Sequence, residues 1–95
     1  MQSADLNLSY HPARNILFQE IRGESVLLNT QTGIYFGLDE SGTEAWNLMQ
    51  RQKNLRGVLN HLLESYEVDP EVCKADLLRF VSGLLKNGLI EAHAR

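Results

Sequence analysis

The sequence is short of cysteine and of long apolar runs. It contains one cysteine, Cys73, among 95 residues, so no internal disulfide can form, and no His or Cys lies near it at metal-site spacing. The longest apolar runs, such as Val26–Leu28, have three residues, whereas a membrane helix needs about 20. The start of the chain is not a basic, apolar signal peptide. We therefore expect no metal, no cofactor and no membrane span, and we predict a cytoplasmic protein.

Basic residues are too few to favour nucleic acid. Nine Lys and Arg face twelve Asp and Glu, and the resulting net charge of −3 opposes binding to phosphate backbones. A DNA-reading winged helix presents several basic side chains on one helix, but the second predicted helix offers only Arg56. The third predicted helix spreads its basic residues around its circumference: Lys74, Arg79 and Lys86. We expect no nucleic-acid partner, and a winged-helix DNA-binding regulator is the weaker alternative.

No group of residues has the pattern of a catalytic site. The three histidines lie far apart in the sequence, at His11, His61 and His93, and the glycines do not have the spacing of a phosphate-binding loop. The helical neighbours of Cys73 are Leu77 and Phe80, which indicates a small core thiol rather than a nucleophile. The sequence therefore predicts a single small domain without enzymatic activity.

The first 14 residues carry no sustained apolar pattern. We expect residues 1–14 to be a flexible N-terminal arm and residues 15–95 to be the folded domain, although Leu6, Leu8 and Tyr10 could alternate onto a surface.

Residues 16–38 have the pattern of three short strands. The segments 16–21, 25–29 and 34–38 are rich in β-branched and aromatic residues. Arg22-Gly23 and residues 30–33 supply the turns, so the segments form an antiparallel meander. Gly37 lies inside the last strand, where a glycine marks either a bulge or an open edge that another backbone can approach.

From Ser41 onward the apolar period is helical. Ser41 and Glu44 match a capping box at the start of a helix that runs to about residue 51, and Asn54 can cap a helix over 55–66. Asp69-Pro70 opens a third helix that Asn87-Gly88 closes, and residues 89–90 can fold back on the core. Three strands followed by three helices predict an α+β, winged helix-turn-helix-like fold.

The third helix is apolar over an unusually wide face. One stripe consists of Cys73, Leu77, Phe80 and Leu84, and an adjoining stripe of Leu78, Val81 and Leu85. A helix packed on one side needs only one stripe. The second either belongs to the core or lines an exposed groove. Beside the open edge of the last strand, such a groove would let an extended peptide add as a further strand.

The ordered set of core residues resembles the PqqD-like family over about residues 16–91. The matching positions are Val26, Leu27, Leu28, Asn29, Gly33, Ile34, Tyr35, Phe36, Gly37, Leu38, Asp39, Gly42, Ala45, Trp46, Leu59, Leu62, Tyr66, Val72, Asp76, Leu77, Phe80, Val81, Leu84, Gly88, Leu89 and Ile90. The segment Tyr35–Leu38 and Trp46 look more like stand-alone members, including those of lasso-peptide clusters, than like members dedicated to pyrroloquinoline quinone (PQQ) synthesis.

This resemblance implies a non-catalytic module that binds the leader of a ribosomally synthesised precursor peptide. The leader would add as an antiparallel strand to the third strand and lie against the third helix. Carried over by position, the site consists of Ile34, Tyr35, Phe36, Gly37 and Leu38, facing Lys74, Leu78, Val81 and Leu85.

The implied partners are the leader and a maturation enzyme, either a radical S-adenosylmethionine enzyme or a leader peptidase. The protein would be a monomer or a strand-exchanged dimer. A docking subunit of a larger enzyme is a further alternative, because the same apolar surface could hold a protein rather than a peptide.

Overall fold

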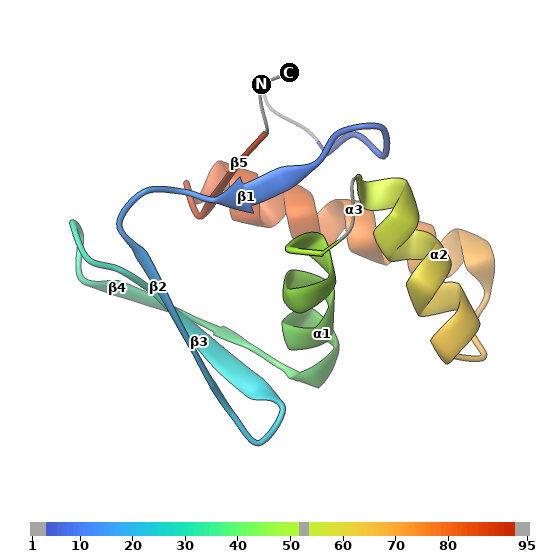
Figure 1. Cartoon of the computed structure of the whole chain (residues 1–95), viewed down its shortest axis with the longest axis horizontal. Coiled ribbons are helices and arrows are strands. Elements are labelled where there is room, and N and C mark those ends of the chain that lie inside the picture. Colours follow the sequence, from blue (N-terminus) through green and yellow to red (C-terminus); the bar gives the residue numbers. More distant parts are fainter. Residues whose placement is uncertain (1–3, 52–53, 93–95) are drawn as a thin grey trace.

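The computed structural model describes residues 4–51 and 54–92. Its elements follow the chain in the order β1 (Tyr10–Pro12), β2 (Ile16–Ile21), β3 (Glu24–Asn29), β4 (Ile34–Leu38), α1 (Glu40–Met49), α2 (Leu55–Ser65), α3 (Pro70–Lys86) and β5 (Ile90–Ala92). The predicted α+β fold, a three-stranded antiparallel sheet followed by three helices, is confirmed (Figure 1).

The three-stranded sheet has the order β2-β3-β4, so β4 lies at an edge. Its tight first turn places Arg22 and Gly23 at positive φ angles of 56° and 84°, as a two-residue hairpin turn requires. The pairing of β3 with β4 is unbroken, and Gly37 lies opposite Val26. Gly37 is therefore not a bulge, and of the two interpretations of this glycine only the open edge remains.

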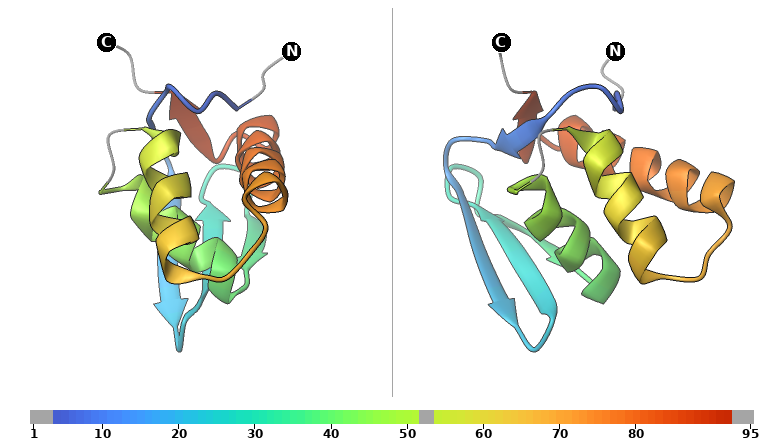
Figure 2. Two further views of the ribbon diagram at one scale, coloured as in Figure 1. Left: turned by 90° about the vertical axis from the view of Figure 1, so that its right-hand side faces the viewer. Right: turned by 45° about the vertical axis from the view of Figure 1, so that its right-hand side comes forward.

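Helix α1 packs on one face of this sheet, and α2 and α3 lie on the same side of the sheet as α1 (Figures 1 and 2). Leu27 is 0% exposed at the centre of this inner face, and the Ser25 and Thr43 hydroxyls form a buried hydrogen bond of 2.7 Å between β3 and α1. The Phe18 ring stacks on Trp46 with centroids 5.8 Å apart. The opposite face, here called the outer face, carries the alternate residues Leu17, Gln19, Ile21, Glu24, Val26, Leu28, Tyr35 and Gly37.

Side-chain caps fix where the helices begin. Asn54 and Asp69 cap α2 and α3 as expected, with Asn54 Oδ1 accepting from the Gly57 backbone and Asp69 Oδ1 from the Glu71 backbone. The capping box at Ser41 is a wrong prediction. Helix α1 begins earlier, at Glu40, because the cap is Asp39.

Most of the N-terminal segment packs on the rest of the domain. This differs from the flexible arm that the sequence predicts for residues 1–14. Strand β1 pairs antiparallel with β5, and Tyr10 is only 4% exposed. The first backbone N–H groups of a helix lack partners within it, and in α2 those of Leu55 and Arg56 donate to the Leu8 and Leu6 carbonyls at 2.9 Å. Residues 1–3, and residues 93–95 at the other end, lie outside the described part.

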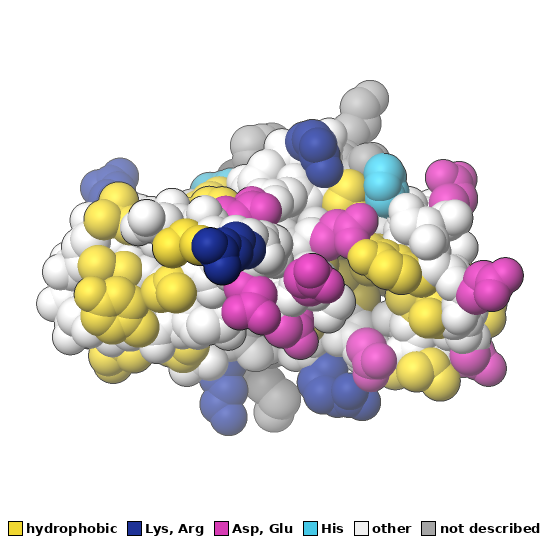
Figure 3. Space-filling view, turned by 90° about the horizontal axis from the view of Figure 1, so that it is seen from below, with side chains coloured by type: hydrophobic (Ala, Val, Ile, Leu, Met, Phe, Trp, Pro, Cys, Tyr) yellow, Lys and Arg dark blue, Asp and Glu magenta, His cyan; other side chains and the backbone are white. Residues whose placement is uncertain are grey.

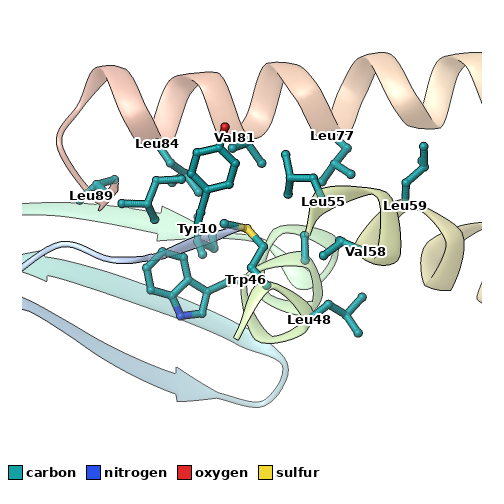
Figure 4. Close-up of a cluster of buried hydrophobic side chains, with 14 of the residues drawn as sticks. Tyr10, Trp46, Leu48, Leu55, Val58, Leu59, Leu77, Val81, Leu84 and Leu89 are labelled. Atoms are coloured by element: carbon teal, nitrogen blue, oxygen red, sulfur yellow. The ribbon is translucent and has the colours of Figure 1, made fainter. Parts of the chain in front are cut away.

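The helical core lies between α3, α1 and α2 (Figure 4). Leu77, Val81 and Leu84 point from α3 toward side chains of the other helices and toward Tyr10. Val81 is 0% exposed. Among the described helices, none combines the length and apolar character that crossing a membrane requires.

Replacing Leu27 with Ala should lower the free energy of unfolding by about 2–5 kcal/mol, because the substitution leaves a cavity in the α1–sheet interface. The matched variant is Leu17→Ala, because Leu17 lies on the outer face and is 59% exposed. This variant should change the free energy of unfolding by less than about 0.5 kcal/mol. Urea denaturation of both variants measures the difference. Equal losses would show that α1 does not anchor the sheet.

Candidate functional site

A groove of about 500 Å³ runs between the end of β4, the start of α1, the end of α2 and one flank of α3. Gly37 and Leu38 line it from β4, while Gly42 and Ala45 line it from α1. This groove lies beside β4, an edge strand whose outward backbone N–H and C=O groups have no partner strand among the described residues.

The far wall of the groove comes from α3 and from the segment that precedes it. The exposed side chains of Tyr66 and Val68 lie at its mouth. The α3 residues of this wall are Val72, Cys73, Asp76, Leu77 and Phe80. The lining is therefore mainly apolar, as in most peptide and ligand sites.

A close approach between α1 and α3 shapes the floor. A methyl group added at Gly42 would lie 3.3 Å from both Phe80 Cε1 and Asp39 Oδ1. A side chain at this position would press on the Phe80 ring and narrow the groove. Gly42 is thus needed here for space, at the first turn of α1.

Two carboxylates reach the groove, and each already has a partner. Asp39 Oδ1 accepts from the Gly42 backbone at 2.8 Å and from the Ser41 hydroxyl at 3.1 Å, and these hydrogen bonds lower the pKa of Asp39 below 3.8. Asp76 forms an ion pair with Arg79 at 2.9 Å. The groove therefore offers an apolar surface with a negatively charged rim.

The groove has no evident reactive group. Burial raises the pKa of the Cys73 thiol, so the thiol remains protonated at neutral pH. Within residues 4–51 and 54–92, no three His, Cys, Asp or Glu side chains cluster as a metal site would require, and His93 lies outside these ranges. At the mouth, the Tyr66 hydroxyl is hydrogen-bonded to the Glu44 carboxylate, and this bond raises the pKa of Tyr66. An apolar groove beside an edge strand is suited to binding an extended segment.

The predicted site residues of β4 lie on the edge strand, but they divide between the two faces. Ile34, Phe36 and Leu38 share the inner face with the residues that contact α1, while Tyr35 and Gly37 lie on the outer face. Only Gly37 and Leu38 line the groove. The remaining positions can contribute to it through their backbone groups.

The α3 residues expected from the sequence are not in the groove. Val81 is fully buried in the core, so its assignment to a peptide surface is wrong. The half-buried Lys74, Leu78 and Leu85 do not line the groove. They lie on the flank of α3 that includes Ser82, whose hydroxyl accepts a hydrogen bond from the Ala4 backbone at 3.1 Å.

The sequence pattern did not single out the α3 residues that line the groove, although it includes their apolar stripe. Cys73, Leu77 and Phe80 belong to the first apolar stripe, which was assigned to the core. The signal that could have separated the stripes was the alternation of Leu6, Leu8 and Tyr10. Tyr10 belongs to the core, and Leu6 and Leu8 pack against it; the same segment reaches the other flank of α3 through the hydrogen bond from Ala4 to Ser82.

Comparison with known proteins places the chain in a family. The model of the family PqqD, coenzyme PQQ synthesis protein D, matches residues 24–90. The chain belongs to the PqqD family. No significant match was found among curated proteins.

Two solved structures share this fold. The first, TbiB1 in complex with the TbiA(beta) leader peptide, is 32% identical with a TM-score of 0.80, and the match covers 88% of this chain and 98% of that one. The second, lasso peptide synthetase B1 complexed with the leader peptide, is 20% identical with a TM-score of 0.80, and the match covers 87% and 98%. At this lower identity, the second comparison supports the fold alone.

Removing the Asp39 cap should destabilise the groove wall. Asp39→Ala should lower the free energy of unfolding by about 1 kcal/mol, whereas Asp39→Asn keeps an oxygen that can cap α1 and should cost less. Because folding lowers the pKa of Asp39, its charge contributes stability above the unfolded pKa of 3.8. That contribution is lost as the pH falls through the folded pKa. Urea unfolding at neutral and acidic pH should therefore show that the difference in unfolding free energy between the wild type and Asp39→Asn shrinks at acidic pH. A difference that stays constant with pH would contradict this account.

Proposed function

We propose that this PqqD-family protein is a non-catalytic adaptor that binds the leader of a ribosomally synthesised precursor peptide and presents it to a maturation enzyme. The observation that carries the proposal is the free edge of β4 beside an apolar groove. The 32% identity to TbiB1, solved with a leader peptide, supports the same conclusion.

Strand addition explains how such a groove would hold a peptide. Backbone hydrogen bonds to the β4 edge supply affinity that does not depend on sequence, and side chains on one face of the added strand enter the groove. Apolar leader residues would pack on Leu62, Phe80 and Val72. The groove has no basic lining residue, so acidic leader residues are disfavoured there.

The chemistry of maturation is assigned to a separate enzyme, because the Cys73 thiol in the groove is protonated at neutral pH and the described residues hold no metal-site cluster. A radical S-adenosylmethionine enzyme or a leader peptidase fits this role, in PQQ-type or lasso-type biosynthesis. The cytoplasmic location and the alternatives of a monomer or a strand-exchanged dimer remain predictions from the sequence.

A charge placed on the groove wall should weaken leader binding. Val72 is 56% exposed on α3, so Val72→Glu should leave the fold intact. It should reduce affinity by roughly tenfold or more, through lost apolar contact and an unpaired carboxylate. Calorimetric titration with the leader of the precursor encoded beside this gene measures the loss. Val26→Glu makes the same substitution on the outer face and should bind normally.

Backbone amide shifts in the same titration locate the peptide. Residues 34–38 and the groove-lining residues of α3 should shift, and those around Lys74, Leu78 and Leu85 should shift less. Shifts concentrated on that second flank would refute the groove assignment. A wild-type protein that binds no leader would refute the function and favour a docking subunit.

N-methylation of the leader separates strand addition from side-chain binding alone. In an antiparallel pair, alternate residues direct their N–H groups to the neighbouring strand. A leader methylated on the amides that face β4 should bind roughly tenfold more weakly or worse. The same peptide methylated one residue further along should bind almost as well as the parent. Equal affinities for both peptides would exclude strand addition.

A further inference from the structure

The outer face of the sheet carries an apolar row that α1 and the groove do not use. The register places Leu17 opposite Leu28, and Leu28 opposite Tyr35, so these three side chains cross all three strands in line. Leu17 is 59% exposed, Tyr35 is 66% exposed and Leu28 is half-buried. We call these three residues the outer row.

No described element covers this face. Helix α1 packs on the inner side, and the other helices lie on that same side of the sheet (Figure 2). Seen from below, hydrophobic side chains gather at the sheet end of the molecule, and acidic side chains separate them from the hydrophobic area at the helical end (Figure 3). Exposed apolar area that is concentrated in this way is typical of a protein-binding surface.

The outer face is continuous with the groove. Gly37, Leu38 and Asp39 line both the groove and the hollow on the outer face. A peptide added to the β4 edge would therefore border both surfaces. A protein seated on the outer face could contact the peptide without displacing it from the groove.

The direction of the added strand decides which end of the outer face meets the rest of the precursor. A leader antiparallel to β4 has its N-terminal end beside Leu38 and its C-terminal end beside Ile34. Because a leader precedes the segment to be modified, that segment leaves the protein at the Ile34 end. The outer row crosses the sheet at this end, one residue from Ile34.

We propose that the outer row is the docking surface for the maturation enzyme that acts on the bound precursor. This inference rests on the proposed leader-binding function. The enzyme is favoured over a second copy of this chain because the row lies beside the exit of the segment to be modified. A second copy seated there would crowd that exit.

The chemistry of the row defines the partner's surface. Of the eight outer-face positions, only Glu24 is charged, and it lies at the other end of the strands; the adjacent turn, residues 30–33, is uncharged. The partner should therefore present aliphatic or aromatic side chains, and docking should depend little on salt.

The test uses two Lys variants on one strand. Leu17→Lys disrupts the outer row. Ile21→Lys changes a residue of similar exposure, 63%, at the far end of the same face, where the new Lys lies opposite Glu24. Each purified full-length variant is titrated with leader. It is then supplied in increasing concentration to the precursor whose leader the wild type binds, together with the enzyme that matures that precursor.

The expected result is normal leader affinity for both variants. Leu17→Lys should raise the adaptor concentration for half-maximal processing about tenfold, and Ile21→Lys should change it by less than about twofold. Unfolding curves exclude a folding defect, and Tyr35→Lys provides a second variant of the row. Sedimentation of each protein alone reports self-association.

Three outcomes would overturn the proposal. The enzyme docks elsewhere if processing with Leu17→Lys and with Tyr35→Lys matches processing with the wild type. The same conclusion follows if Leu17→Lys and Ile21→Lys change the concentration for half-maximal processing equally. A wild-type dimer that dissociates in Leu17→Lys would assign the row to a second copy. Failure of the wild type to bind leader in the first titration would instead refute the proposed function.

Discussion

The packing of α1 on the inner face of the sheet is the contact on which the rest of this structure depends. It buries Leu27 and joins β3 to α1 through the Ser25–Thr43 hydrogen bond. Because one face of a three-stranded sheet is covered in this way, the other face and the β4 edge remain available. Asp39 ends the connection from β4 and caps α1, so the edge strand and the groove floor are fixed relative to each other.

The N-terminal segment has the complementary role on the helical side. It supplies the carbonyls that α2 needs at its first turn, and Ala4 reaches Ser82 on α3. One flank of α3 is thereby engaged, and the flank with Cys73 and Phe80 faces the groove. The wide apolar face of α3 thus has two uses: part of it forms the core, and part lines the proposed leader site.

The proposed function divides the sheet between two partners. The groove on one side of β4 suits a peptide, since it is mainly apolar and adjacent to the edge of the described sheet. The outer row on the other side is uncharged and exposed, and it suits a protein surface. A small domain can in this way bring a peptide and an enzyme together, because both surfaces border the same strand.

Local signals in the sequence are enough to predict the separate elements of this protein. The alternation of apolar residues predicts β2, β3 and β4, Arg22-Gly23 predicts the hairpin turn, and Asn54 and Asp69 predict two helix starts, because these signals act within a few residues. The place of Tyr10 in the core depends instead on the pairing of β1 with β5, some 80 residues away. The burial of Val81 and the position of Phe80 in the groove also depend on contacts between elements. Periodicity defines the apolar stripes of a helix, but the rotation of the helix about its axis is set by what packs against it.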